Sequence, residues 1–106
     1  MVTPNAELPL FDKNVAIETG VYCMLADLIP MSQIPEIAQN IHREKPNLSF
    51  HAIKSTANNL GFVRLADYAH RIEKLGPTMG KDIIEKACKT ILKLNEESIE
   101  ETKNDE

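Results

Sequence analysis

The stretch of residues 51–76, HAIKSTANNLGFVRLADYAHRIEKLG, decides the fold because it carries the apolar spacing of two helices in succession. At about 100° of rotation per residue, Phe50, Ile53 and Leu60 share one face of the first helix. Gly61 then ends or bends that helix, since glycine suits a left-handed cap. Beyond it, apolar residues recur at helical spacing, at positions 62, 65, 66, 69, 72 and 75. The stretch therefore predicts two helices that meet at Gly61.

His51 falls on a different face of the first helix from this apolar stripe. It shares a polar face with Ser55 and Asn58, and Lys54 stands at the edge of that face, one turn after His51. A histidine buried for structural reasons would more naturally take a position in the stripe. Neutral imidazole is a good nucleophile near pH 7, and an adjacent lysine would offset the charge of an anionic electrophile such as a phosphoryl group. We therefore predict an exposed and reactive His51.

The second helix is expected to bring a carboxylate to the imidazole. If the chain reverses near Gly61, the position level with His51 lies near residue 71, and His70 and Glu73 flank that level. Glu73 could accept the Nδ1–H of His51, which would fix the tautomer and leave Nε2 free to attack. His70 would complete this network or hold Glu73. Two alternatives stay open, a surface Glu73 paired with a nearby Lys or Arg, and a simply solvated Lys54.

These residues resemble the histidine-containing phosphotransfer (HPt) domain. The hallmark of that family is His-x-Leu/Ile-Lys-Gly followed by small residues and a glycine, and here it reads HAIKSTANNLG. The stretch is especially similar to the phosphoacceptor domain of chemotaxis histidine kinases. There, a second His and a Glu follow the phosphorylated His by 19 and 22 residues, and His70 and Glu73 stand at those offsets from His51.

The resemblance implies that His51 carries a phosphoryl group on Nε2 and exchanges it with an aspartate of a response-regulator receiver domain. Lys54 would help to neutralise the phosphate, while Glu73 and His70 would orient the imidazole. The receiver would supply Mg²⁺, so no cofactor and no metal of the chain's own is expected. A hybrid or chemotaxis-type histidine kinase is the other implied partner.

Ser55 and Asn58, on the same polar face as His51, are the residues that we expect to contact a docking partner. Ser55 departs from the family pattern, which usually has glycine at that position, and its hydroxymethyl group could crowd a docking receiver. Some free-standing relay proteins of the family also carry serine there. The segment before His51 is short and interrupted by Pro35 and Pro46, so its docking contacts are not assigned.

The flanking segments also read as helices. NVAIETGVYCMLADLI, from about residue 14, predicts one helix or two short ones, capped by Asn14 and stopped by Pro30. Pro35 suits the first turn of the next helix, and Asn47 offers a cap for the helix that holds His51. KDIIEKACKTILKLNEESIEE, after Gly76, carries an apolar stripe of about five turns.

The predicted fold is therefore all-α, an antiparallel up-down four-helix bundle of the HPt type with a short N-terminal arm or an extra helix. The 106 residues suit a single domain over residues 1–106. Within it, residues 1–13 form the arm, and the acidic end over residues 96–106 is expected to fray into solvent.

Composition narrows the class of partner and the compartment. A formal net charge of −4 argues against nucleic acid and against an anionic membrane surface. The chain has no apolar run of the length a membrane span needs, and its start lacks the pattern of a secretion signal. Cys23 and Cys88 stand far apart and are expected to be small buried hydrophobes. We expect a cytoplasmic protein and, from its polar acidic surface, a monomer.

Three functions are weighed. The first is a free-standing phosphorelay intermediate, a phosphocarrier rather than a true enzyme, with no autokinase activity because the sequence has no ATP-binding domain. The second is an HPt-like module that is never phosphorylated and inhibits a receiver or kinase by binding it. The third is a metal site built from His42, His51, His70 and nearby carboxylates, whose spacing matches no known ligand motif.

Overall fold

Every regular element in the described part of the chain is a helix. The computed structural model describes residues 2–41 and 45–104. The α-helices are α1 (Lys13–Glu18), α2 (Leu25–Met31), α3 (Ile34–Gln39), α4 (Pro46–Leu60), α5 (Val63–Glu73) and α6 (Lys81–Asn104), and two 3₁₀ turns are η1 (Tyr22–Met24) and η2 (Gly76–Thr78). The all-α class predicted from the sequence is confirmed.

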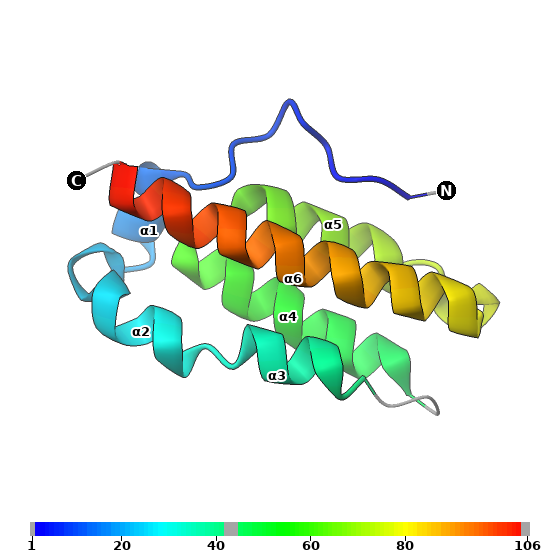
Figure 1. The fold of residues 1–106 in the computed structure, drawn as a ribbon. Coiled ribbons are helices and arrows are strands. Elements are labelled where there is room, and N and C mark those ends of the chain that lie inside the picture. Colours follow the sequence, from blue (N-terminus) through cyan, green and yellow to red (C-terminus); the bar gives the residue numbers. More distant parts are fainter. Residues whose placement is uncertain (1, 42–44, 105–106) are drawn as a thin grey trace.

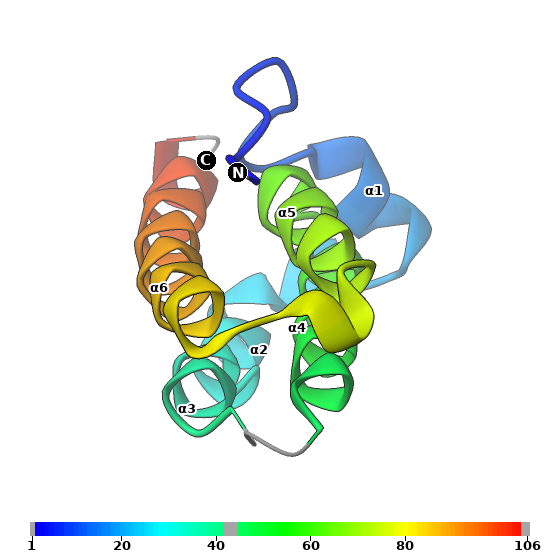
Figure 2. The ribbon, with the colours of Figure 1, turned by 90° about the vertical axis from the view of Figure 1, so that its right-hand side faces the viewer.

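The helices surround one hydrophobic core. Figure 1 shows α4, α5 and α6 with roughly aligned axes, while α2 and α3 follow one another along one side. Both α3 and α5 pack against α4 and α6, and the end view of Figure 2 shows the helices arranged around the core. The largest fully buried apolar side chains are Phe50, Phe62, Ile34, Ile53, Leu65, Ile72 and Ile91. The apolar stripe predicted for α4 thus faces the interior.

Gly61 lets the chain reverse between α4 and α5. Its φ of 83° lies in the left-handed region, which glycine adopts without steric cost. It also lets the N-terminal arm approach, because a Cβ at this position would lie 2.7 Å from the backbone oxygen of Asp12. The Asp12 amide in turn donates to the Gly61 carbonyl over 2.8 Å. One glycine therefore fixes both the α4–α5 turn and the entry into α1.

The N-terminal arm is hydrogen-bonded to two arginine side chains of α5. The Arg64 side chain donates from Nε to the Leu8 carbonyl over 2.8 Å, and Arg71 donates from a terminal guanidinium nitrogen to the Thr3 carbonyl over 2.7 Å. Phe11 is buried, and its ring meets Phe62 edge to face. Because the two arginines are seven residues apart, they lie on the same side of the helix and hold the arm at two points.

The segment after the arm is more broken than expected. Asp12 rather than Asn14 caps α1, because its side chain accepts the Asn14 amide over 2.9 Å. Gly20, at φ 78°, separates α1 from η1. Pro30 does not stop the helix before it but lies inside α2, which ends one residue later at Met31.

The helices on either side of residues 42–44 also differ in detail from the prediction. Pro35 lies in the first turn of α3 as predicted, after Gln33, whose φ of 59° is left-handed. Pro46 is the first residue of α4 and Lys45 precedes it as the cap residue, so Asn47 lies inside the helix and does not cap it. Proline suits this first position because the amide there needs no helical partner.

The acidic end does not fray within the described residues. Helix α6 continues through it as far as Asn104. The reason is that its inner face is still covered, with Ser98 fully buried and Ile99 packed against the core. Residues 105 and 106, which belonged to the same expectation, lie outside the described residues.

Candidate functional site

His51 lies in the second turn of α4 with its ring in solvent. The side chain is 58% exposed, whereas Phe50 and Ile53 beside it in sequence are fully buried. The difference follows from helical geometry, since these neighbours turn inward while His51 turns away from the core. The predicted exposure of His51 is confirmed.

Glu73, at the end of α5, meets the imidazole of His51. Nδ1 of His51 and Oε1 of Glu73 are 3.0 Å apart, although the residues are 22 positions apart in sequence. With the imidazole neutral and the carboxylate ionised, Nδ1–H donates to the carboxylate and Nε2 keeps its lone pair. The contact predicted from the reversal at Gly61 is present. It leaves one nucleophilic nitrogen on an open surface.

His70 approaches the other oxygen of the same carboxylate without a hydrogen bond. Its Nδ1 lies 3.9 Å from Oε2 of Glu73, one helical turn away. Both atoms are buried, and neither has a hydrogen-bond partner among the described residues. A small movement of either side chain would join them, because buried polar atoms gain by pairing. In the structure, His70 flanks the His51–Glu73 pair but does not extend it.

Lys54, Ser55 and Asn58 lie on the α4 surface beyond His51. Lys54 is half-buried, and Ser55 and Asn58 are exposed. The Lys54 ammonium makes no hydrogen bond or ion pair with any residue that the structure describes, so its charge is available to an approaching anion. The sequence predicted Ser55 and Asn58 on the same face of the helix as His51, with Lys54 at the edge of that face. The spacing of these residues within α4 agrees with that prediction.

Leu48 is a surface residue of this site that the sequence reasoning did not single out. It lies three positions before His51 on α4 and is 65% exposed, unusually so for a large apolar side chain. Its three-residue spacing from His51 was the signal that could have revealed it. The imidazole of His51 therefore has an apolar neighbour on one side and polar, cationic neighbours on the other.

The described residues offer no metal centre. They contain no group of three or more His, Cys, Asp or Glu side chains placed to hold an ion. His42, one of the residues of the metal-site alternative, lies outside the described residues. Within residues 2–41 and 45–104, no helix combines the length and the apolar character needed to cross a membrane.

The two cysteines differ from the expectation that both are buried. Cys23, in η1, is exposed, while Cys88, in α6, is half-buried. Burial raises the pKa of the Cys88 thiol above its ordinary value. The prediction was wrong for Cys23, which lies in η1, a turn that contains no buried residue.

Comparisons of the chain with protein-family models, with curated proteins and with solved structures find no match.

Proposed function

We propose that this chain is a histidine phosphotransfer protein of a two-component phosphorelay, which carries a phosphoryl group on His51 between aspartates of receiver domains. The observation that carries the proposal is the 3.0 Å contact between Nδ1 of the exposed His51 and Glu73. Such a contact prepares Nε2 as a nucleophile. An exposed imidazole on a convex helix suits a macromolecular donor better than a small substrate, which would need a concave site.

The transfer step follows from this geometry. The Nε2 lone pair attacks the phosphorus of an aspartyl phosphate in line with the bond to the leaving oxygen. The N–P bond forms as the P–O bond breaks, and the aspartate leaves as a carboxylate. Nδ1 keeps its proton, so the ring becomes positively charged, and Glu73 stabilises that charge. The reverse reaction returns the phosphoryl group to a second aspartate.

The neighbours of His51 are given supporting roles. Lys54 would offset the charge of the phosphoryl oxygens during transfer. The receiver would bring Mg²⁺ with its own acidic pocket, so this chain needs no cofactor. Ser55 and Asn58 would lie under the docked receiver, and the exposed Leu48 would add apolar contact area to the same surface.

The proposal includes the architecture that the sequence analysis expected. Together, α2 and α3 would take the place of one helix in an antiparallel up-down four-helix bundle, with α4, α5 and α6 as the others. The break between them at Gln33 interrupts the helix without removing it from the core, since Ile34 and Ala38 of α3 are fully buried. A monomeric, cytoplasmic phosphocarrier without kinase activity of its own is the form we infer.

The direct test is transfer from a phosphorylated receiver domain. The wild-type chain should take up acid-labile, alkali-stable phosphate, and His51→Gln should abolish the uptake because the nucleophilic nitrogen is gone. His70→Gln is the matched control, since it changes the same residue type on the neighbouring helix. It should still be labelled. Labelling that survives His51→Gln would refute the assignment.

A second function is favoured by Ser55, whose exposed side chain stands where the HPt family usually has glycine. In this alternative the chain binds a receiver or kinase and inhibits it without accepting phosphate. Receiver binding by wild type with no phosphate on the chain would favour it. If Ser55→Gly then restored labelling, the serine would be identified as the cause.

A further inference from the structure

The hairpin of α4 and α5 carries a net charge opposite in sign to that of the rest of the chain. Residues 45–76, which contain both helices, have five Lys and Arg side chains against two Asp and Glu, a net charge of +3. The remaining residues have seven against fourteen, a net charge of −7. Figure 2 shows α4 and α5 on one side of the core and α6 on the other. His51 therefore lies on a cationic part of an acidic molecule.

Both carboxylates of the hairpin already have partners. Asp67 accepts from Nε of Arg71 over 2.9 Å. Glu73 lies 3.0 Å from Nδ1 of His51. The two arginines of the hairpin are engaged as well, because Arg64 and Arg71 donate to carbonyls of the N-terminal arm. The charges of the hairpin that stay available to a partner are therefore those of its lysines.

The three lysines of the hairpin make no hydrogen bond or ion pair with any residue that the structure describes. They are Lys45, Lys54 and Lys74, which we call the lysine surface. Lys45 is the cap residue of α4, and Lys54 lies one turn after His51 on the same helix. Lys74 is the cap residue at the end of α5 and directly follows Glu73. Lys45 and Lys74 are exposed, and Lys54 is half-buried. Three unpaired ammonium groups thus surround the imidazole.

The extent of the lysine surface favours a protein with a local acidic patch over a polyanion. A nucleic acid or an anionic membrane would extend beyond the hairpin and meet the −7 charge of the remaining chain. A protein partner would contact mainly the hairpin. Leu48, which is 65% exposed beside His51, supplies apolar contact area of the kind that protein interfaces use.

We propose that the lysine surface docks the acidic rim around the donor aspartate of a receiver domain. This inference rests on the proposed function, in which the receiver brings Mg²⁺, because a pocket that binds Mg²⁺ needs carboxylates. The attraction acts before contact, turns His51 toward the aspartate and raises the association rate. Lys45 and Lys74 act in docking, whereas Lys54 also offsets the charge of the phosphoryl group.

The test is the association rate with an unphosphorylated receiver domain, measured by stopped-flow fluorescence with the full chain. Lys74→Glu should slow association about threefold or more at about 50 mM salt, and the difference should largely vanish at about 1 M salt. Lys45→Glu should act in the same direction. Its carboxylate would stand at the N-terminus of α4, where it favours the helix, so this variant stays informative if Lys74→Glu folds poorly.

Lys93→Glu is the matched control for the charge reversal. Lys93 is exposed on α6, which lies across the core from α4 because both helices pack against α3 and α5. The variant makes the same change in net charge and should alter the association rate by less than about twofold. Equal effects of Lys74→Glu and Lys93→Glu would overturn the docking surface.

Phosphate transfer to the wild-type chain, measured separately at saturating phosphorylated receiver, tests the proposed function alone. Receiver binding that depends on Lys45 and Lys74, with no phosphate on His51, would support the docking surface and refute the transfer. No binding of any receiver would overturn the docking surface. Tighter binding of the wild-type chain to a DNA duplex or to phosphatidylserine vesicles than to the receiver would also overturn it.

Discussion

At the scale of single residues, the contact between Glu73 and His51 has a cost in stability. Glu73 is 24% exposed, and one of its oxygens is buried without a hydrogen-bond partner among the described residues. A buried, unpaired carboxylate oxygen costs free energy. The other oxygen holds the Nδ1–H of an imidazole that is itself mostly in solvent. The pair is better explained by orientation of the ring than by any contribution to the core.

Replacement of the carboxylate by an amide tests that orientation. In Glu73→Gln the amide oxygen can still accept from Nδ1–H, but it carries no charge to stabilise the cationic ring. We expect phosphoryl transfer from a receiver to slow about tenfold or more, the difference between a charged and a neutral hydrogen bond. Rapid-quench transfer kinetics give the rate. Glu100→Gln, on the exposed face of α6, is the control and should transfer like wild type.

The sequence predicted this pair because the two residues are nearly equidistant from Gly61, and a helical hairpin brings such positions level. It did not predict the cap by Asp12, because Asp12 and Asn14 are equally good capping residues and only the approach of the arm to Gly61 selects between them. Nor did it indicate that Asn95 and Ser98 are buried in α6. Their polarity argued for the surface, and the core contacts of the neighbouring residues overrode it.

At the scale of the elements, the short helices α2 and α3 show that local sequence alone does not decide where a helix begins and ends. We predicted that Pro30 stops a helix and that Pro35 lies in the first turn of the next one, because proline has no amide hydrogen for a helical hydrogen bond. In the structure Pro30 lies in the last turn of α2 and Pro35 in the first turn of α3. By contrast, α6 extends further than its acidic sequence predicted, because Ser98 and Ile99 pack against the core and hold the last turns.

A comparison of Gly20 with Gly61 distinguishes the cost of backbone strain from the cost of steric crowding. Gly20 and Gly61 have similar positive φ values of 78° and 83°. A Cβ at Gly20 meets nothing within 4 Å, whereas at Gly61 it lies 2.7 Å from the Asp12 oxygen. Gly20→Ala should therefore lower the free energy of unfolding by about 1–2 kcal/mol, the cost of left-handed backbone alone.

Gly61→Ala should cost about 1–3 kcal/mol more than Gly20→Ala, because the arm must also move away from the turn. Urea denaturation followed by circular dichroism measures both variants. Equal losses would mean that the arm yields freely, in contradiction of the close approach at Gly61. The arm hydrogen bonds of Arg64 and Arg71 would then contribute little to its position.

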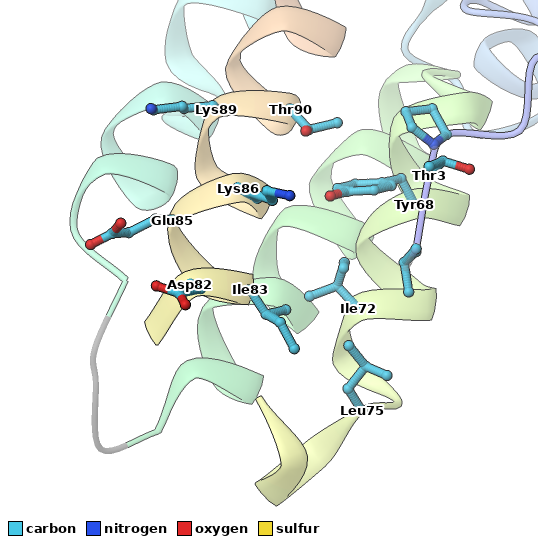
Figure 3. Close-up of a pocket in the computed structure, with 12 residues that line it drawn as sticks. Thr3, Tyr68, Ile72, Leu75, Asp82, Ile83, Glu85, Lys86, Lys89 and Thr90 are labelled. Carbon is cyan, nitrogen blue, oxygen red and sulfur yellow. The ribbon is translucent and has the colours of Figure 1, made fainter. Parts of the chain in front are cut away.

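At the scale of the whole molecule, helical periodicity along most of the chain predicted the all-α class. It did not predict the opening between α5 and α6. A chain of 106 residues has little room for a large ligand cavity, yet an opening of about 1130 Å³ lies between α5, α6 and residues 2–4 of the arm (Figure 3). Because the roof of the opening is the irregular arm, whose course depends on Arg64 and Arg71, its size is a tertiary property. The same region contains Tyr68, which is 2% exposed and joins α5 to α6 through Thr90.

Tyr68 predicts how the stability of the whole molecule responds to alkali. Burial raises the pKa of its phenol above the ordinary value of about 10. Above that pH the unfolded chain loses this proton first and binds fewer protons than the folded chain, so the free energy of unfolding falls as pH rises. The stabilisation is complete below about pH 10 and is lost as pH rises through the higher folded pKa.

Tyr68→Phe should flatten this decline between about pH 9 and 11 in urea denaturation, whereas Tyr22→Phe, on η1, should keep it. An equally steep decline in Tyr68→Phe would show that other groups, with Cys88 the first to examine, control the alkaline unfolding.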